Sequence, residues 1–384
     1  QLMDVLAKRR REILQDELNT EQLSYGELES EVRAVLSALD AQQYSRRLFG
    51  KDGTIWKSDE EAVEHIQNRL GWLDSVQEFQ SRVAELEGFT EEVRSAGYDF
   101  VVLLGMGGSS LSSEVMRQTF GSADGYPEFL MLDNTDPEAV QAVEAQVDLE
   151  KTLLIVGSKS GGTTETMSFY RYFFGRVQDV AGEAAGDHFI AITDPETPLV
   201  EVAEEHHFRR TFLNPADIGG RYSVLSWFGL VPIALMGIDA RALLDSAYRM
   251  LQSCRPFVPA ERNPAVHLGA MLGINHQHER DKLTFVFSES LEYFGFWLEQ
   301  LLAESTGKEG KGLVPVVGEE LAAPEAYNPD RQFVYIFLDN EQSESVERKL
   351  QALERAGYPV ARIGVRDKID LGAEFFRWEM VTAT

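Results

Sequence analysis

The sequence predicts an α/β protein with two doubly wound parallel sheets and a helical N-terminal region. Short apolar, β-branched runs alternate with amphipathic helical segments from Phe100 to about Gly237, and the alternation returns from Ala265 to Val365. The 384 residues are also too many for one small core. We therefore expect a helical region at residues 1–82, a first sheet domain at 83–255, and a second at 256–384 that is truncated at its C-terminus.

The composition limits the function. A net charge of −27 argues against nucleic acid and anionic membrane surfaces as partners, and an anionic substrate would need locally placed cations. The one cysteine, Cys254, permits no internal disulfide and fits a reducing compartment, so we expect a cytoplasmic protein. No uninterrupted apolar run is long enough to span a bilayer.

The N-terminal region has a helical pattern. Leu2–Leu39 is charged and amphipathic, Gly50–Gly53 is a turn, and helical segments continue with breaks from Asp59 to Ser95. The basic run Lys8–Arg11 has acidic neighbours, which favours a solvated helix face over a binding patch.

The first sheet domain is predicted to contain five strands. They are Phe100–Leu104, Glu128–Leu132, Thr152–Val156, Phe189–Ile192 and Arg210–Leu213. In the order 2-1-3-4-5, the first and third strands are neighbours at the switch point, where such sheets bind ligands. A strongly apolar helix, Tyr222–Met236, follows.

The second sheet domain repeats this alternation after a proline-rich boundary at Cys254–Asn263. Its expected elements are helix Ala265–His278, strand Leu283–Ser288, helix Leu291–Ala303, strand Phe333–Leu338, helix Ser343–Ala356, strand Val360–Val365 and a final helical pattern at Gly372–Thr384.

A glycine turn, Gly105-Met-Gly-Gly-Ser-Ser110, follows the first strand and opens a helix. Its spacing allows a dinucleotide loop with Asp133 as the ribose ligand, although Ser110 replaces the third glycine, and it also allows a plain tight turn. Gly108 and Ser109 would offer a backbone amide and a hydroxyl to an anion at the helix N-terminus.

A second turn, Ser158–Thr166, follows the third strand. Its hydroxyls and its lysine are close together in sequence: Ser158, Lys159, Ser160, Thr163 and Thr164. The turn lacks the order of a nucleotide P-loop, so ATP is not expected. Small hydroxyls with backbone donors suit a terminal phosphate monoester without a metal. The two turns together predict a phosphorylated ligand between them.

Two charged residues could carry chemistry. Arg221 follows a Gly-Gly turn at the start of the apolar helix, either as a cation near developing negative charge or as the partner of a surface acid. Glu304 stands just before a helix stop at Gly307. The negative end of the helix dipole, together with partial burial, would make this carboxylate a stronger base, whereas the alternative is an ordinary exposed glutamate.

Four motifs occur in the order found in the glucose-6-phosphate isomerase family, which the chain resembles from roughly Val83 onward. They are Gly105–Ser109, Ser158–Thr166, Gly219–Ser223 and Glu304–Lys308. Lys51–Trp56 and Asn68–Trp72 are most similar to the isomerase half of bifunctional transaldolase/glucose-6-phosphate isomerases. The resemblance implies two sugar-isomerase (SIS) domains, a homodimer, and no metal or redox cofactor. It also implies a transaldolase domain ahead of Gln1 and a continuation past Thr384.

The resemblance further implies reversible isomerisation of glucose 6-phosphate and fructose 6-phosphate, in glycolysis and gluconeogenesis. Ser109 and the Ser158–Thr163 loop would hold the phosphate, Glu304 would move a proton between C1 and C2 through a cis-enediolate, and Arg221 would stabilise that charge. The chain departs from the family in having no histidine after His278 to open the sugar ring and no C-terminal lysine stretch. A non-catalytic sugar-phosphate sensor and a nicotinamide-dependent dehydrogenase are the alternatives.

Overall fold

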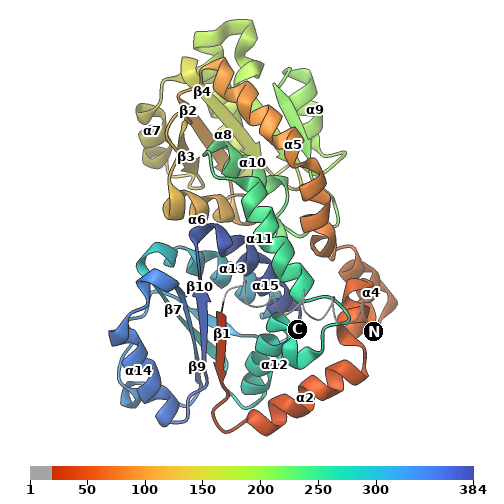
Figure 1. Ribbon diagram of the computed structural model, residues 1–384. Helices are drawn as coiled ribbons and strands as arrows, with labels where there is room; N and C mark the ends of the chain where they lie inside the picture. The colour runs from red at the N-terminus through yellow and green to blue at the C-terminus, as the bar shows by residue number, and fades with distance from the viewer. Residues whose placement is uncertain (1–19) are drawn as a thin grey trace, which may run out of the picture. The chain divides into compact units, whose positions relative to one another are not determined.

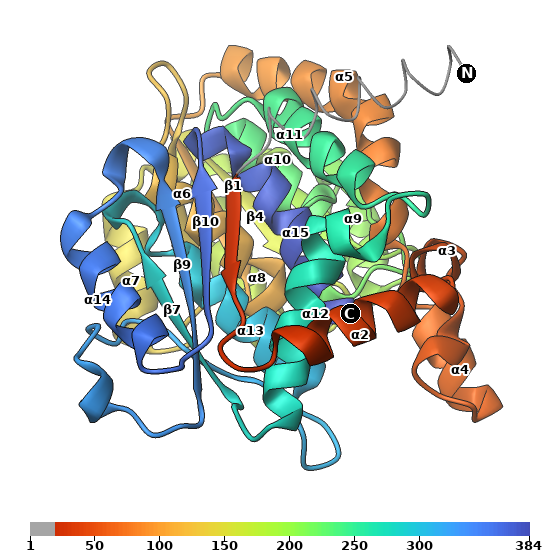
Figure 2. The same cartoon turned by 60° about the horizontal axis from the view of Figure 1, so that its bottom comes forward.

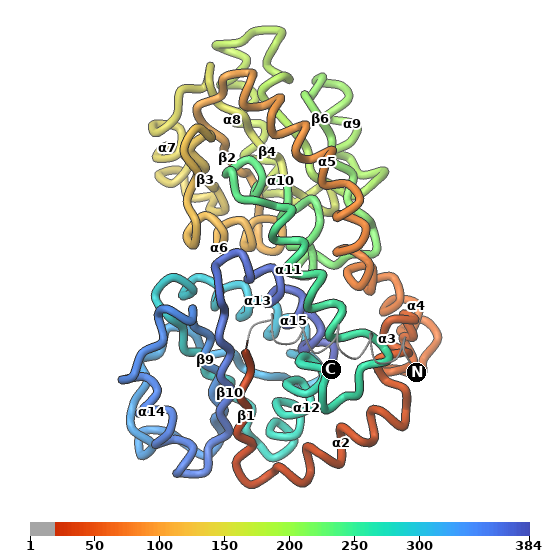
Figure 3. Tube along the Cα trace, in the orientation of Figure 1, coloured from red at the N-terminus to blue at the C-terminus, as the bar shows by residue number. Residues whose placement is uncertain are grey.

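The computed structural model describes residues 20–384, which fall into two compact units (Figure 1). The insert unit is Asn68–Arg241, and the terminal unit combines the chain up to Gln67 with Ala242–Thr384. The boundaries between these units differ from those of the three parts expected from the sequence. The reason is that the N-terminal segment joins the C-terminal sheet. Figure 3 shows the Cα trace leaving the terminal unit after α4 (Glu60–Gln67) and returning to it along α11 (Ala240–Ser253).

The insert unit contains a parallel sheet in the order β3-β2-β4-β5-β6. Its strands are β2 (Phe100–Gly105), β3 (Glu128–Leu132), β4 (Thr152–Gly157), β5 (Phe189–Thr193) and β6 (Arg210–Leu213). This confirms all five predicted strands and the predicted order 2-1-3-4-5. Gly105 pairs with Gly157 at the ends of the two central strands, so the turns that follow them begin side by side.

Helices cover both faces of this sheet. They are α5 (Trp72–Ala96), α6 (Leu111–Phe120), α7 (Pro137–Gln146), α8 (Thr164–Ala181), α9 (Pro198–Glu205) and α10 (Trp227–Leu235). One core cluster joins Leu104 and Val156 of the strands to α7, α8 and α9. On α5 and α10, Phe79 meets Trp227 edge to face at 4.9 Å between ring centroids. Burial on both faces explains why the strands are apolar runs rather than alternating ones.

The terminal unit has a second sheet in the order β1-β10-β9-β7-β8. Its strands are β1 (Thr20–Ser24), β7 (Lys282–Phe287), β8 (Val314–Val316), β9 (Arg331–Leu338) and β10 (Val360–Val365). All pairs are parallel except β1 with β10, and Figures 1 and 2 show the red β1 beside the blue β10.

The predicted helix over Leu2–Leu39 is therefore wrong at Thr20–Ser24, while its residues before Thr20, with Lys8–Arg11, lie outside the described residues. β1 is a strand because the open edge of β10 offers its backbone groups hydrogen-bond partners. The short strand β8 contains Pro315 and lies at the other edge, and the sequence pattern did not predict it.

The terminal unit also contains several described helices. They are α2 (Glu29–Ala41), α3 (Tyr44–Phe49), α4 (Glu60–Gln67), α11 (Ala240–Ser253, entering from the insert unit), α12 (Pro264–Gln277), α13 (Phe294–Thr306), α14 (Glu344–Arg355) and α15 (Leu371–Ala383). Of these, α2 packs on α12 and on α3. On one face, Trp378 of α15 packs on Phe285 of β7 with ring centroids 5.3 Å apart, and α12 and α13 pack against α15. Between Thr20 and Thr384, no helix combines the length and apolar character that a membrane span requires.

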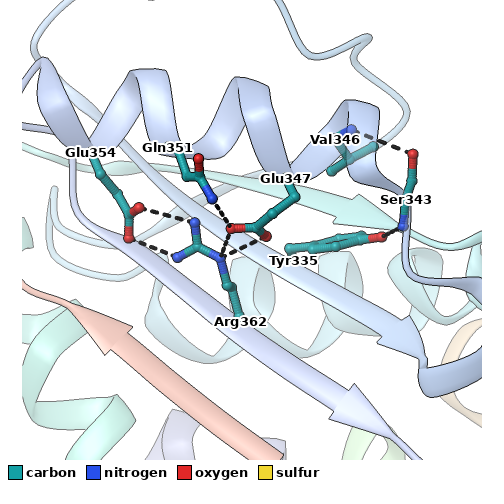
Figure 4. Close-up of polar contacts among 7 residues, drawn as sticks. All are labelled: Tyr335, Ser343, Val346, Glu347, Gln351, Glu354 and Arg362. Carbon is teal, nitrogen blue, oxygen red and sulfur yellow. Dashed lines mark hydrogen bonds and ion pairs between the residues drawn. The ribbon is translucent and has the colours of Figure 1, made fainter.

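A buried ion cluster joins the other face of this sheet to α14. Arg362 on β10, with 8% of its side chain exposed, donates two hydrogen bonds to Glu354 at 2.7 and 3.0 Å and two to Glu347 at 2.9 and 3.1 Å (Figure 4). Gln351 donates to Glu347 at 3.2 Å. The guanidinium therefore fixes α14 on the sheet through two acids on one face of that helix.

Candidate functional site

The insert unit contains a cavity of about 470 Å³ at the carboxyl ends of its strands. It brings together both glycine turns predicted from the sequence. The predicted residues that line it are Gly108, Ser109, Lys159, Ser160 and Thr163. Their meeting follows from the sheet order, since β2 and β4 are neighbours and end together.

The first turn is packed against the Gly219-Gly220-Arg221 turn. Gly107 has a φ of +55°, which suits glycine. A Cβ on Gly108 would lie 2.6 Å from the carbonyl carbon of Gly220, so only glycine allows this approach. The Ser109 hydroxyl accepts a hydrogen bond from the Met106 amide at 3.0 Å and donates to the Met106 carbonyl at 2.8 Å. These contacts make the turn a compact cradle in the cavity wall.

The second turn is braced by Ser158. This serine is only 1% exposed and does not line the cavity, unlike Lys159, Ser160 and Thr163. Its hydroxyl lies 2.9 Å from that of Thr163, and its amide donates to the Ile192 carbonyl at 3.0 Å. Thr163 precedes α8 without capping it through its side chain. Its hydroxyl and the first amides of α8 are thus positioned for an anion.

Lys159 is tied into the cavity wall. Its ammonium pairs with the Asp194 carboxylate and donates to the Ala216 carbonyl at 3.0 Å. These bonds connect the loops after β4, β5 and β6. Burial raises the pKa of Asp194 above its usual range, while Lys159 acts in the opposite direction.

Arg221 lies half-buried on the short turn Gly220–Tyr222. Its neighbours Gly220 and Ser223 line the cavity, although Arg221 itself is not among the lining residues. Ser223 donates to the Gly220 carbonyl at 2.5 Å, which holds the turn closed. The predicted apolar helix begins later than expected, with α10 starting at Trp227.

Glu304 belongs to the terminal unit, near the C-terminal end of α13. Gln300 donates to its carboxylate at 3.1 Å, and the Lys308 ammonium donates to its carbonyl. The side chain is exposed, so the partial burial expected from the sequence is absent. The two glycine turns and the expected base therefore belong to separate units.

Two charged residues that sequence reasoning missed also line the cavity, Arg69 and Asp194. Arg69 lies in the Asn68–Trp72 segment, which the sequence marked only as a resemblance. Asp194 directly follows β5. Its position after a predicted parallel strand was a usable signal, because such strand ends meet at the ligand edge. Among residues 20–384, no group of three or more His, Cys, Asp or Glu side chains is arranged to hold a metal ion.

A doubly wound parallel sheet with two glycine turns at one cavity defines the class of α/β proteins that bind ligands at the carboxyl ends of their strands. Residues 21–315 match the family described as phosphoglucose isomerase, and the chain belongs to that family.

Known proteins resemble the chain over part of their length. The glucose-6-phosphate isomerase of Rubrobacter xylanophilus is 29% identical over 300 residues, which are 74% of this chain and 65% of that protein. The chain spans about half to two-thirds of the length of the curated relatives that match it.

Two solved structures share the fold. A hypothetical protein from Thermus thermophilus aligns with a TM-score of 0.77 and 24% identity, covering 95% of this chain and 93% of that one. A glucose-6-phosphate isomerase from Chlamydia trachomatis aligns with a TM-score of 0.66 and 20% identity, covering 88% and 72%.

Proposed function

We propose that the chain interconverts glucose 6-phosphate and fructose 6-phosphate, with no metal or redox cofactor. The observation that carries the proposal is the meeting of both glycine turns at one cavity, in a chain of the phosphoglucose isomerase family. The relatives named above as glucose-6-phosphate isomerases support the choice of substrate.

The phosphate binds at the insert-unit cavity. The hydroxyls of Ser109, Ser160 and Thr163 and the amide of Gly108 provide neutral donors, and the N-terminal end of α8 adds a partial positive charge. Such contacts persist through the reaction, so they set affinity more than turnover.

Glu304 serves as the base. It removes the C2 proton of the open-chain aldose and returns it to C1. The hydroxyl proton of O2 moves to O1, so the aldose and the ketose differ only in the positions of two hydrogen atoms. Arg221 stabilises the intervening cis-enediolate. One positioned base is worth roughly 10²–10⁴-fold in rate.

A coupled assay tests the proposal. Fructose 6-phosphate is given to the purified chain in the presence of EDTA, and glucose 6-phosphate is followed through a dehydrogenase that reduces nicotinamide. Conversion of fructose 6-phosphate to glucose 6-phosphate without a metal is expected. Binding of glucose 6-phosphate without conversion would favour the sensor, and binding of reduced nicotinamide in the absence of the coupling enzyme would favour a dehydrogenase.

We further propose a cytoplasmic homodimer that acts in glycolysis and gluconeogenesis. The resemblance of Lys51–Trp56 and Asn68–Trp72 to the bifunctional enzymes supports a transaldolase on the same polypeptide. Light scattering would measure the oligomeric state, and the intact mass and transaldolase activity of the protein from its native source would test the fusion.

A further inference from the structure

We propose that Arg69 is the cation that binds the ligand's phosphate in this cavity, and that Lys159 and Asp194 form a positioning pair in the wall. The inference rests on the proposed function, whose phosphate site it makes more specific. Three observations carry it: how the Arg69 segment is held, what already neutralises Lys159, and which cation remains.

The Arg69 segment is fixed to the turn that closes the cavity. Leu70 forms an antiparallel bridge with Ile218, and the Gly71 amide donates to the Asp217 carbonyl at 3.0 Å. A Cβ on Gly71 would lie 2.1 Å from an Asp217 carboxylate oxygen, so a side chain there would displace that carboxylate. The bridge places Arg69 at the cavity, with its Cδ 3.9 Å from the position of a Cβ on Gly219.

Two apolar anchors hold the same segment. Leu70 is 5% exposed and Trp72 only 2%, and the Trp72 ring lies 5.3 Å from that of Tyr222. Arg69 itself is exposed. The residues of the Arg-Leu-Gly-Trp sequence therefore have different roles: the last three dock on the 217–222 loop, and the first lines the cavity.

Lys159, the cation expected from the sequence, is already compensated. Its ammonium pairs with Asp194 and with the Ala216 carbonyl, and the pair is mostly shielded from solvent, with 25% and 13% of the two side chains exposed. A phosphate that used Lys159 would have to compete with a carboxylate held against it, or else lie beside that carboxylate.

Arg69 has no such carboxylate bonded to it. The structure gives this guanidinium a hydrogen bond to the Asn68 carbonyl at 3.0 Å, and it shows no Asp or Glu of residues 20–384 within ion-pair distance. The positive charge of Arg69 nevertheless acts on Asp194. It lowers the pKa of that carboxyl group, although burial raises the pKa by more. In a chain with a net charge of −27, it supplies the positive charge that a dianion needs, and its planar fork can bind two phosphate oxygens.

The test compares Arg69→Gln with Arg171→Gln, an exposed arginine of α8 that does not line the cavity. Calorimetric titration would use glucose 6-phosphate, inorganic phosphate and glucose. Arg69→Gln should weaken both phosphate ligands by ~10-fold or more, because a bond to a charged group is lost. Arg69→Lys should recover part of that loss, since it keeps the charge without the fork. Raising the salt concentration should reduce the difference in phosphate affinity between the wild type and Arg69→Gln.

Lys159→Gln provides the second readout. It should lower the thermal unfolding midpoint more than Arg69→Gln does. The reason is that it removes the bonds of Lys159 to Asp194 and Ala216, which connect the loops after β4, β5 and β6. Phosphate affinity that is unchanged in Arg69→Gln, or lost in a well-folded Lys159→Gln alone, would overturn the inference. A wild-type chain that binds glucose as tightly as glucose 6-phosphate would instead overturn the proposed function.

Discussion

Arg377 of α15 donates a hydrogen bond to Glu21 of β1 at 2.9 Å, although 356 residues separate them in sequence. Arg377 is 1% exposed, and the fully buried Glu374 lies 3.4 Å from it. Two carboxylates thus share one guanidinium inside the terminal unit. Burial raises the pKa of Glu21 from 4.5 to about 7, although Arg377 acts in the opposite direction and Glu374 adds to the rise.

This cluster makes the stability of the terminal unit depend on pH. Because the pKa of Glu21 is higher in the folded state, its stabilising contribution is full below about pH 4.5 and is lost as the pH rises through about 7. Glu21→Gln cannot ionise, so its unfolding free energy relative to wild type should rise over this range, by at most on the order of 3 kcal/mol. Urea unfolding at pH 5 to 8 measures the difference. Glu27→Gln, at an exposed position, is the matched control.

Glu304→Gln should remove catalysis and keep binding. The amide preserves the shape of the side chain and loses its basicity, so turnover should fall roughly 10²–10⁴-fold while the affinity for glucose 6-phosphate stays within a small factor. Glu299→Gln, on the exposed side of the same helix, is the matched control. A Glu304→Gln enzyme that retains more than half of the wild-type rate would show that another group is the base.

Thr163→Ala should weaken substrate binding more than it slows turnover. Thr163 lines the cavity and bonds to Ser158, so its loss removes a phosphate donor and loosens the turn. The expected cost is about 0.5–1.5 kcal/mol in binding free energy, and somewhat more toward a dianion. Thr164→Ala, at the exposed next position, should leave KM unchanged. Equal effects on the binding of glucose and glucose 6-phosphate would contradict a phosphate contact.

Arg362→Met should destabilise the terminal unit, because it leaves Glu347 and Glu354 facing the sheet without their cation (Figure 4). Breaking such a buried cluster costs roughly 3 kcal/mol. Thermal and urea unfolding would measure the loss, with Arg355→Gln at an exposed site of α14 as control. Changing both glutamates to glutamine in the Arg362→Met background should restore part of the stability. If it restores none, repulsion between the acids is not the cause.

The sequence predicted the insert-unit sheet well because its strands are buried on both faces. In Phe100–Leu104 or Thr152–Val156, the apolar run is itself the signal, and the glycine that follows each run marks the turn. The meeting of the two turns at one cavity was predictable for a related reason, because neighbouring parallel strands end at the same edge of the sheet. Binding of phosphate by these turns stays a prediction.

What the sequence could not predict depends on distant partners. β1 has the composition Thr-Glu-Gln-Leu-Ser, and only the edge of β10 makes it a strand. The pairing of Lys159 with Asp194 required choosing one of 63 acidic residues. Arg69 reaches the cavity through a bridge to Ile218 that no local pattern contains. In each case, the decisive contact joins segments that lie far apart in the sequence, and local sequence patterns do not contain such contacts.

The terminal unit is formed by two segments of the chain with the insert unit between them, and this affects the order in which the two units can fold during translation. The ribosome produces β1 before any strand of the insert unit and produces its partner β10 after all other described strands. A nascent chain that has reached Arg241 already contains both glycine turns and the whole sheet of the insert unit. The partner strand of β1, which is β10, has not yet been synthesised at that point. We therefore expect the cavity of the insert unit to form during translation, and β1 to stay unpaired until β10 has been synthesised.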